Sequence, residues 1–560
     1  MTSTTRPGLP LLLVVAALLS LAIGAGAVAQ AQAPAAAPAL YAGPIPQAPC
    51  SPGGVPERGE QGRVSAADID SGAAADGFRC NTIKLGRLGA TGGFQTHRYI
   101  DAKGQECGYF DSTLLFPKDT APNATEGGPG VYVLDMSDPA NPKQVGTLST
   151  PAMLSPHESL RLNAKRGLLA ADMGYPTTNP GVVDIYDVSQ NCLKPVLKSS
   201  TPFGIFGHES GFAPDGNTFY VSGTTGKTLT ALDVSDPALP RILFTSADYT
   251  IHGMSLSDDG NRLYAADIGN PGLTVFDSSQ IQARTLNPQL PIISHLTWPE
   301  VSIPQNTDPV TIAGRKYLIE VDEYTSSTTR GPMATNTQVG AARIIDINDD
   351  TKPFVVSNLR LAVHQPKNRA GSQASDPGAS SPVQGYAGHY CAVPRREEPT
   401  IVACSMIVSG LRIFDIRNPV KPVEVGYYNT PVLPGVDFVK NGAFAMSAPA
   451  FAANRDEIWY TDGNSGFFSL RLTGAAKAAL NNTSPVPSGA AGSPVTVTPP
   501  AVTPPAVTSP AVTSPAVTPL AAGPRSGVLA ATGLPAGLPW AMLAALLLAA
   551  AALRRRHQDQ

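Results

Sequence analysis

Charged and aromatic residues are scarce in this chain. Among its 560 residues, Asp, Glu, Lys and Arg make up 15%, Phe, Trp and Tyr make up 6%, and the formal net charge is −3. A charge this close to neutral gives no electrostatic reason to expect nucleic acid as a partner. The chain also has few long charged stretches, which together with its 54 prolines and 53 glycines excludes a coiled coil.

Sequence motifs of several enzyme classes are missing as well. The chain contains no His-Glu-x-x-His zinc motif, no Gly-x-Ser-x-Gly nucleophile motif and no phosphate-binding glycine loop. Proline and glycine, in contrast, are abundant, with 54 and 53 residues. Their abundance predicts many turns, and the uneven spread of the prolines indicates a proline-rich tail.

The N-terminal residues 1–33 are typical of a secretory signal peptide. Arg6 precedes an apolar run, and Ala27-Val28-Ala29 and Ala31-Gln32-Ala33 match the Ala-x-Ala pattern of signal cleavage. An uncleaved membrane anchor is the alternative. A leading segment, residues 34–79, separates this end from the repeats described below.

The C-terminal part begins with a stalk, residues 476–528, in which Pro-Ala-Val-Thr recurs with a period of five. Proline favours the extended polyproline II conformation, so we expect a semi-rigid spacer without a core. Residues 529–560 contain Leu-Ala-Ala-Thr-Gly, the apolar stretch Leu534–Leu553 and three arginines. An apolar stretch of this length can span a bilayer as a helix, and the arginines would keep its end in the cytoplasm.

This order of motif, apolar helix and arginines resembles a sortase sorting signal of the LAxTG type, typical of high-GC Gram-positive bacteria. The resemblance implies that Leu529, Ala530, Thr532 and Gly533 form the recognised motif. It further implies cleavage after Thr532 and attachment of that threonine to the cell wall, so that the protein is exported to the cell surface. A retained C-terminal membrane anchor is the alternative.

Six segments between the two ends share one pattern, which is a short apolar strand ending in Asp, a polar turn and a second strand. They end at Asp135, Asp187, Asp233, Asp277, Asp346 and Asp415, and a degenerate seventh copy ends at Arg471. Repeats of this length with several short strands are typical of propeller blades. Because an Asp carboxylate can accept backbone N–H groups in an Asx turn, we interpret these aspartates as structural.

Each repeat predicts a four-stranded blade. Asp215-Gly216 and Asp259-Gly260 lie between apolar runs and predict A–B hairpins, strand C ends in Asp, and strand D follows. The last blade has no fourth strand, and residues 81–88 resemble a D strand, so we expect them to close the ring.

The predicted fold class is therefore all-β. We expect a seven-bladed β-propeller over residues 80–475, closed by an N-terminal strand and followed by a disordered stalk and a C-terminal apolar helix. The expected blade edges lie near residues 150, 201, 247, 294, 362 and 430.

The segments Asp135–Gly146 and Asp415–Gly426 resemble LVIVD repeats, which form bacterial extracellular β-propellers. The stretch from His389 to Asp415 is also close to that family's pattern, and the resemblance covers about residues 80–475. It implies the propeller fold but little chemistry, because the family has no agreed activity and a fold alone does not determine function.

The six cysteines are an even number, compatible with three disulfides in an exported protein. Cys391 and Cys404 fall on strands A and B of one hairpin, where we expect them to pair. Cys50, Cys80, Cys107 and Cys192 allow three pairings, among which the sequence does not decide. A redox role is the lesser interpretation, because no Cys-x-x-Cys occurs.

Five histidines recur 11 or 12 residues before strand B of a blade: His97, His157, His208, His252 and His389. Strand A is innermost in a propeller, so these positions predict a ring of imidazoles at one mouth of the channel. Thr307 or Asp308, and Ser447, take the place in the other two blades.

Imidazole is a common ligand of transition metals, which makes the ring a candidate site for Cu, Zn or Fe. Glu158, Glu209 and the Asp322-Glu323 pair could join or orient the histidines. Packing between blades and acid–base catalysis are the alternatives.

Two functions remain open. The first is a cell-wall-anchored binding or scaffold module, attached through sortase, that binds a surface protein or glycan through the loop face around the channel mouth. Residues 112–130, 302–308, 324–341 and 365–388 are expected as long loops on that face, where binding sites commonly lie. The second is a surface metalloenzyme or metal-binding protein that uses the histidine ring.

The sorting motif generates a first prediction. Replacing Thr532 with Ala should remove the residue that sortase joins to the wall, so the protein should leave the cell-wall fraction and enter the medium. Immunoblots of wall, membrane and medium fractions measure this distribution, with Thr518→Ala in the stalk as the control. A Thr532→Ala protein that stays in the wall fraction would exclude sortase.

Overall fold

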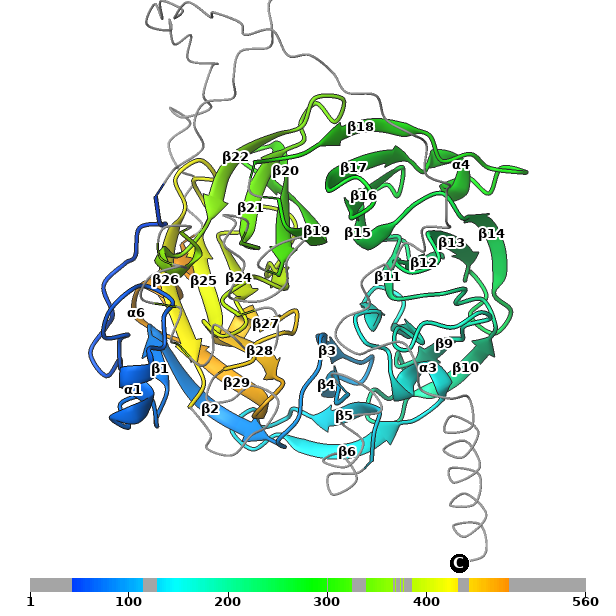
Figure 1. Cartoon of the computed structure of the whole chain (residues 1–560). Coiled ribbons are helices and arrows are strands. Elements are labelled where there is room, and N and C mark those ends of the chain that lie inside the picture. The colour runs from blue at the N-terminus through cyan, green and yellow to red at the C-terminus, as the bar shows by residue number, and fades with distance from the viewer. Residues whose placement is uncertain are drawn as a thin grey trace, which may run out of the picture. The chain divides into compact units, whose positions relative to one another are not determined.

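A computed structural model of the chain describes residues 43–113, 128–299, 301–324, 339–365, 368, 373, 376, 385–431 and 443–482. The predicted signal peptide, residues 483–528 of the predicted stalk and the sorting signal with its apolar helix lie outside the described residues. Residues 476–482, which the sequence assigned to the stalk, are described and lie largely in α6 (Gly474–Asn481). The described strands form seven antiparallel sheets arranged in a ring (Figure 1). The prediction of an all-β, seven-bladed propeller is therefore confirmed.

Blades one to four each contain four consecutive strands, ordered from the axis outwards. Blade one has β3 (Thr96–Ile100), β4 (Glu106–Asp111), β5 (Val131–Asp135) and β6 (Lys143–Leu148). Blade two has β7 (Arg161–Asn163), β8 (Leu168–Asp172), β9 (Val183–Asp187) and β10 (Val196–Thr201). Blade three has β11 (Glu209–Phe212), β12 (Thr218–Gly223), β13 (Thr228–Asp233) and β14 (Arg241–Ser246). Blade four has β15 (Ile251–Leu256), β16 (Arg262–Asp267), β17 (Gly272–Asp277) and β18 (Ile292–Leu296).

Blades five to seven complete the ring, and the last two include strands from the N-terminal part of the chain. Blade five has β19 (Ile303–Ile312), β20 (Arg315–Glu323), β21 (Ala342–Asp346) and β22 (Phe354–Leu359). Blade six has β23 (Cys391–Ala392), β24 (Ile401–Ser405), β25 (Leu411–Asp415), β26 (Val423–Asn429) and β1 (Phe78–Cys80). Blade seven has β27 (Ala450–Ala452), β28 (Glu457–Asp462), β29 (Gly466–Leu472) and β2 (Thr82–Leu88).

The ring closes through strands from its two ends. β2 pairs antiparallel with β29, from Thr82 opposite Leu472 to Leu88 opposite Phe467. Figure 1 shows the blue β2 beside the orange β29. The closing strand predicted at residues 81–88 is confirmed. The sequence did not predict β1, which adds a fifth strand to the outer edge of β26.

The aspartates that end the C strands have the structural role expected of them. In all six repeats, one carboxylate oxygen accepts the backbone N–H of the residue two positions on, at 2.8–3.0 Å. This Asx-type hydrogen bond fixes the turn that leads into strand D.

The apolar core is divided among the contacts between blades. The described residues form a buried hydrophobic cluster between each pair of neighbouring blades. Between blades one and two, for example, Tyr109 and Val133 pack with Leu169. Burial of both faces of each sheet fixes the blades against one another, because both faces carry apolar side chains.

The helices of the described residues are few and short. They are α1 (Ala66–Asp70), α3 (Pro151–Leu154), α4 (Ser279–Gln282), α6 (Gly474–Asn481), η1 (Ala362–His364) and η4 (Ala453–Arg455). Within the described ranges, no helix has the length and apolar character needed to cross a bilayer.

Blade five differs from the sequence-based expectation. Residues 302–308 were expected as a loop, but β19 begins at Ile303 and continues through Thr307 and Asp308 to Ile312. A register shift between Pro304 and Asn306 accommodates the extra length of this strand against β20. Pro304, Asn306 and Asp308 are residue types common in turns, but this stretch pairs with β20 as a strand.

Three disulfides are present, and no cysteine is free. Cys391 and Cys404, the pair expected from the sequence, face each other in the hairpin of blade six. The remaining bridges join Cys50 to Cys80 and Cys107 to Cys192. The first ties the leading segment to the end of β1, and the second ties blade one to blade two.

The leading segment is attached to blade six through a buried charge cluster. Arg412, fully buried, forms ion pairs with Glu57 of the leading segment and, at 3.1 Å, with Glu424 of β26. Its guanidinium also lies 4.4 Å from the ring centre of Tyr427. Gln61 donates a further hydrogen bond to Glu424. Two buried carboxylates thus share one permanently charged side chain.

This cluster generates a second prediction. Replacing Arg412 with Ala leaves Glu57 and Glu424 buried without a counter-charge, which should lower the free energy of unfolding by about 3–5 kcal/mol. The control is Arg417→Ala, because Arg417 pairs with Asp415 at a partly exposed position, where a loss of at most about 1 kcal/mol is expected. Urea unfolding of both variants measures the difference. Equal losses of unfolding free energy would show that the buried cluster stabilises the fold no more than the partly exposed ion pair.

Candidate metal centre

The innermost strands of blades three, four and six bring three histidines to equivalent positions. Strand register defines the equivalence. The same position of strand B is paired with Ser210 in blade three, with Met254 in blade four and with Cys391 in blade six. Two residues before each of them lies a histidine: His208, His252 and His389. All three are at least nine-tenths buried.

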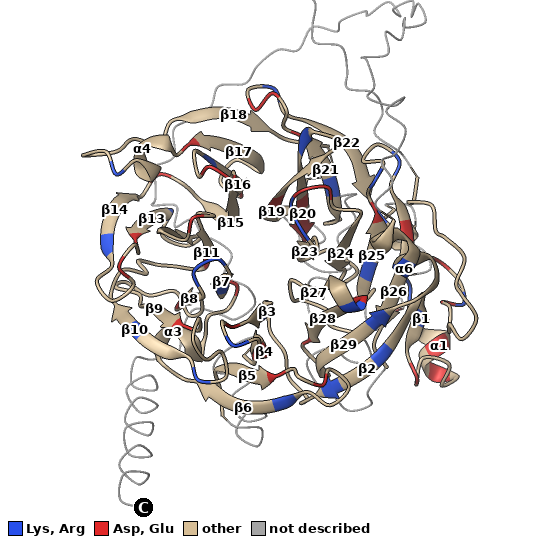
Figure 2. Ribbon diagram, turned by 180° about the vertical axis from the view of Figure 1, so that it is seen from behind, with Lys and Arg blue, Asp and Glu red and all other residues tan. Residues whose placement is uncertain are grey.

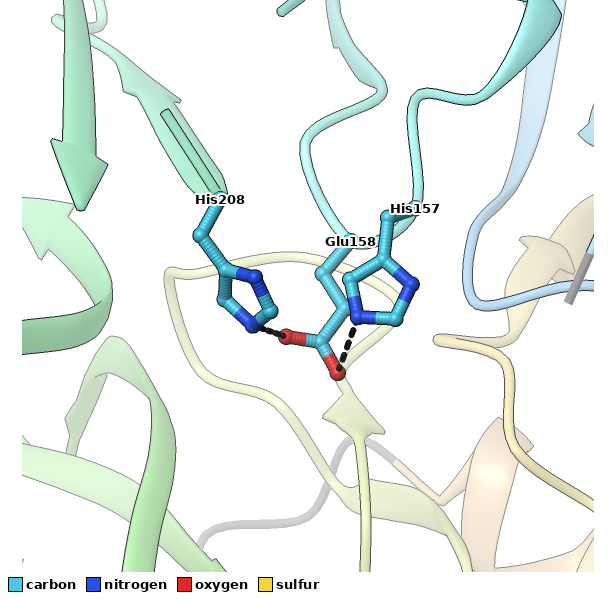
Figure 3. A group of neighbouring side chains, drawn as sticks. All are labelled: His157, Glu158 and His208. Atoms are coloured by element: carbon cyan, nitrogen blue, oxygen red, sulfur yellow. Dashed lines mark ion pairs between the residues drawn. The ribbon is translucent and has the colours of Figure 1, made fainter. Parts of the chain in front are cut away.

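Blade two contributes two side chains in an unexpected way. Its register, with Arg161 opposite Ala170, places Glu158 at the position that His208 has in blade three. His157 lies one residue earlier, and its backbone adopts the left-handed conformation with φ of 53°. Few residues with a side chain adopt this conformation, and here it brings the His157 imidazole beside Glu158. Figure 3 shows both residues coming from one loop and meeting His208.

Glu158 lies at the centre of the cluster. One carboxylate oxygen, Oε2, is 3.1 Å from Nε2 of His208 and 3.0 Å from Nε2 of His252. The other, Oε1, is 3.2 Å from Nε2 of His389 and 3.9 Å from Nε2 of His157. Four imidazoles from four blades therefore surround one buried carboxylate.

A second carboxylate borders the cluster. Glu323, at the end of β20, lies 3.6 Å from Nε2 of His389 and 3.8 Å from Nδ1 of His252. Figure 2 shows the acidic residues of β19 and β20, in red, beside the axis of the ring. The ligand atoms of Glu158, Glu323 and His389 lie within 4.8 Å of one another, as do those of His157, Glu158 and His208.

Backbone carbonyls orient the three equivalent imidazoles. Nδ1 of His208 contacts the carbonyl of Gly174 at 3.2 Å, Nδ1 of His252 that of Pro304 at 3.1 Å, and Nδ1 of His389 that of Met446 at 2.6 Å. Since a carbonyl only accepts hydrogen bonds, each Nδ1 carries a proton and donates it. The Nε2 atoms therefore remain to bind whatever occupies the centre of the cluster.

The spacing of these Nε2 atoms matches a shared ion. Nε2 of His208 and Nε2 of His252 are 3.3 Å apart. Two imidazole ligands at 2.0–2.1 Å from a tetrahedral metal are separated by about 3.3–3.4 Å. This pair could thus bind one metal ion with little rearrangement.

The electrostatics of the cluster favour a positive charge at its centre. Burial raises the pKa of Glu158, but the charge of His252 and the hydrogen bonds from His208 and His252 outweigh burial and hold the pKa well below its usual value. Burial lowers the pKa of His208, but the hydrogen bond and charge of Glu158 outweigh it and raise the pKa. Glu158 thus remains ionised and is balanced by protons on imidazoles, which a metal cation could replace.

His157 is the least constrained member of the cluster. Neither of its ring nitrogens has a hydrogen-bond partner, although the side chain is buried. Its ring packs 4.4 Å from Phe94 and 5.7 Å from Tyr175, centre to centre. Burial lowers the pKa of His157 to about 3, so the ring is neutral and carries a free lone pair. Such a nitrogen is costly to bury without a partner, and a metal ion would supply one.

His97 lies outside the cluster. Its Nε2 contacts the carbonyl of Leu160 at 2.9 Å, and burial lowers its pKa to about 4. In blade one, Thr96 is paired with Phe110 and is equivalent to Ser210 of blade three. The residue two positions earlier is Phe94, which therefore takes the place of His208. The A–B hairpin of blade one is longer than that of blade three. A fixed number of residues counted back from strand B therefore ends at His97, which lies within strand A, three residues after the ring position of Phe94.

The remaining expected residues have other partners. Glu209 bonds to Arg161 and Tyr390, and Asp322 bonds to Arg343 and the indole of Trp298. In blade five the register assigns the ring position to Gln305 rather than to Thr307 or Asp308. Ser447 holds that position in blade seven, as expected, and bonds to the backbone N–H of Thr461.

Sequence reasoning missed Phe94, Gln305 and Tyr390. Phe94 and Gln305 were missed because the A–B hairpins of blades one and five are longer than that of blade three, and every count along the chain to strand A includes the hairpin length. No sequence signal indicates that Tyr390 reaches Glu209 across the channel.

The donor set fits a transition metal. Three oriented imidazoles, a fourth with unpartnered nitrogens and an ionised carboxylate are the ligands that Cu, Zn and Fe prefer.

Comparison with known families identifies one repeat. Residues 407–430, which cover the C and D strands of blade six, match the LVIVD repeat. This match to one repeat and the seven blades support a repeat β-propeller. A search of curated proteins finds no match to the chain.

Solved structures resemble the chain only remotely. The β-propeller domain of Cps50 (Swd1) from Myceliophteria thermophila is 12% identical, with a TM-score of 0.42, and the match covers 70% of this chain and 100% of that one. Hydrazine synthase from Kuenenia stuttgartiensis is 13% identical, with a TM-score of 0.42, over 70% of this chain and 97% of that one. Likenesses at this level carry no argument about function.

Proposed function

We propose that the protein is a metal-binding β-propeller. His208, His252 and His389 with Glu158 would hold one transition-metal ion, of the class Cu, Zn or Fe, and His157 lies close enough to join them. The observation that carries the proposal is the convergence of imidazoles from blades two, three, four and six on one buried, ionised carboxylate. A packing role alone would not require unpartnered nitrogens on His157.

The residues of the chain have separate tasks in this proposal. The carbonyls of Gly174, Pro304 and Met446 keep the Nδ1 protons in place, so that Nε2 binds the ion. Phe94 packs against His157 and His389 and keeps water from that side of the site. A bound ion of this class would supply Lewis-acid or redox chemistry.

The cellular setting is part of the same proposal. The protein would be exported and joined to the cell wall through Thr532, with the stalk between the propeller and the wall. Three disulfides support an oxidising compartment outside the cytoplasm.

A binding or scaffold role for a surface protein or glycan is the second candidate. The propeller fold supports it, because loops on a rigid ring provide a binding face.

Metal content tests the proposal. Protein purified without chelators, or reloaded with Cu(II) or Zn(II), should contain about one ion per chain by mass spectrometry. His208→Ala should lose it, because the variant lacks one of the two nitrogens that are 3.3 Å apart. Bound metal should also raise the Tm of the wild type but not of the variant, because the ion binds only the folded chain.

His97→Ala is the matched control, since it removes an imidazole from an inner strand without touching the cluster. It should keep the metal and the rise in Tm. A wild type that takes up neither Cu nor Zn would contradict the proposal and leave the binding or scaffold role.

A further inference from the structure

A second polar layer lies directly behind the histidine cluster. Glu209 follows His208 in the sequence and Tyr390 follows His389, and both side chains are fully buried. The Tyr390 hydroxyl donates a hydrogen bond to Oε1 of Glu209. Blades three and six are as far apart in the ring as two of seven blades can be, so this hydrogen bond crosses the central channel.

Two further side chains support this contact. Arg161 of blade two pairs with Oε1 of Glu209 at 2.9 Å, and its guanidinium lies 6.0 Å from the ring centre of Tyr390. Gln305 of blade five donates a hydrogen bond to the Tyr390 hydroxyl at 2.9 Å. The layer thus joins blades two, three, five and six.

The backbone of blade four packs against the same layer. A Cβ atom at Gly253 would lie 2.7 Å from Oε2 of Glu209 and 2.3 Å from the carbonyl oxygen of Gln305. The absence of a side chain at this position therefore lets the strand that carries His252 approach the layer closely.

We infer that Tyr390 and Glu209 are positioning residues of the metal centre, which fix the separation of His208 and His389 across the channel. Consecutive residues of a strand share their backbone, so a shift of Tyr390 or Glu209 moves the histidine that precedes it. The Nδ1 hydrogen bonds orient each ring, whereas this contact sets the distance between two blades. The inference rests on the proposed metal-binding function.

Tyr390→Phe tests the inference. This change removes one hydroxyl and leaves the ring that packs against His389 at 4.7 Å. Loss of such an outer contact should weaken metal binding about 10–100-fold. Dissociation constants for Cu(II) and Zn(II), from competition with a chelator, measure the change. The Cu(II) electron paramagnetic resonance spectrum should also change, because the geometry of the ligands changes.

Tyr386→Phe is the matched control. Tyr386 is also buried, and its hydroxyl bonds to the carboxylate of Asp376 and the carbonyl of Val64, outside the centre. It should leave both the affinity and the spectrum unchanged. Gln305→Met, which removes the donor to Tyr390, should weaken binding in the same direction and serves as the test if Tyr390→Phe does not fold.

The outcomes separate the two proposals. If the wild type binds metal and Tyr390→Phe binds it with the same affinity and spectrum, the inference is wrong and the metal site stands. If the effects of Tyr386→Phe and Tyr390→Phe are equal, the contact has only a general structural role and the inference is also wrong. If the wild type binds no metal, both proposals are wrong.

Discussion

The antiparallel pairing of β2 with β29 is the interaction on which the rest of the structure depends. The apolar faces of each blade pack only against its neighbours, so a ring that is open at one point could spread without breaking any other sheet. Such spreading would separate the residues of the candidate metal centre, because they come from blades two, three, four and six. Distances of about 3 Å between side chains of different blades can persist only when the ring is closed.

Three of the clusters of buried carboxylates differ in the source of the counter-charge. Glu57 and Glu424 share the charge of Arg412, and Glu320 and Asp322 share that of Arg343. A guanidinium keeps its charge at any pH relevant to a folded protein, so these two clusters always contain a cation of the protein itself. Glu158, in contrast, faces only imidazoles, whose protons can be exchanged for a metal ion. The same burial that makes the first two clusters structural therefore makes the third one suited to bind a cation.

The propeller could be predicted in detail because its signals are local. The Asx turn after each C strand, the Asp-Gly hairpins and the resemblance of residues 81–88 to a D strand each depend on a few adjacent residues. The backbone hydrogen bonds that Asp135 and the other repeat aspartates accept confirm the interpretation of these residues as structural. β1 and the contacts of the leading segment were not predicted, since they depend on pairing with β26 and Arg412, which are distant in sequence.

The candidate site was harder to predict for a geometric reason. A count from strand B assumes hairpins of equal length, and the longer hairpin of blade one made His97 appear to belong with the others. Likewise, the contact of Tyr390 with Glu209 follows from the diameter of the ring and not from any spacing in the chain. The pairing of four cysteines could not be deduced either, because the positions of Cys50 and Cys192 depend on a segment without repeats and on a turn.

The arrangement of the closing strands has a consequence for the order of folding. β1 and β2 are synthesised before every blade, yet their partners β26 and β29 belong to the last two blades. The first strands must therefore wait, with their hydrogen-bonding edges unpaired, until nearly the whole propeller has been made. A chain that ends before β29 leaves β2 without its partner and the seventh sheet incomplete. Only a chain synthesised through β29 can therefore close the ring.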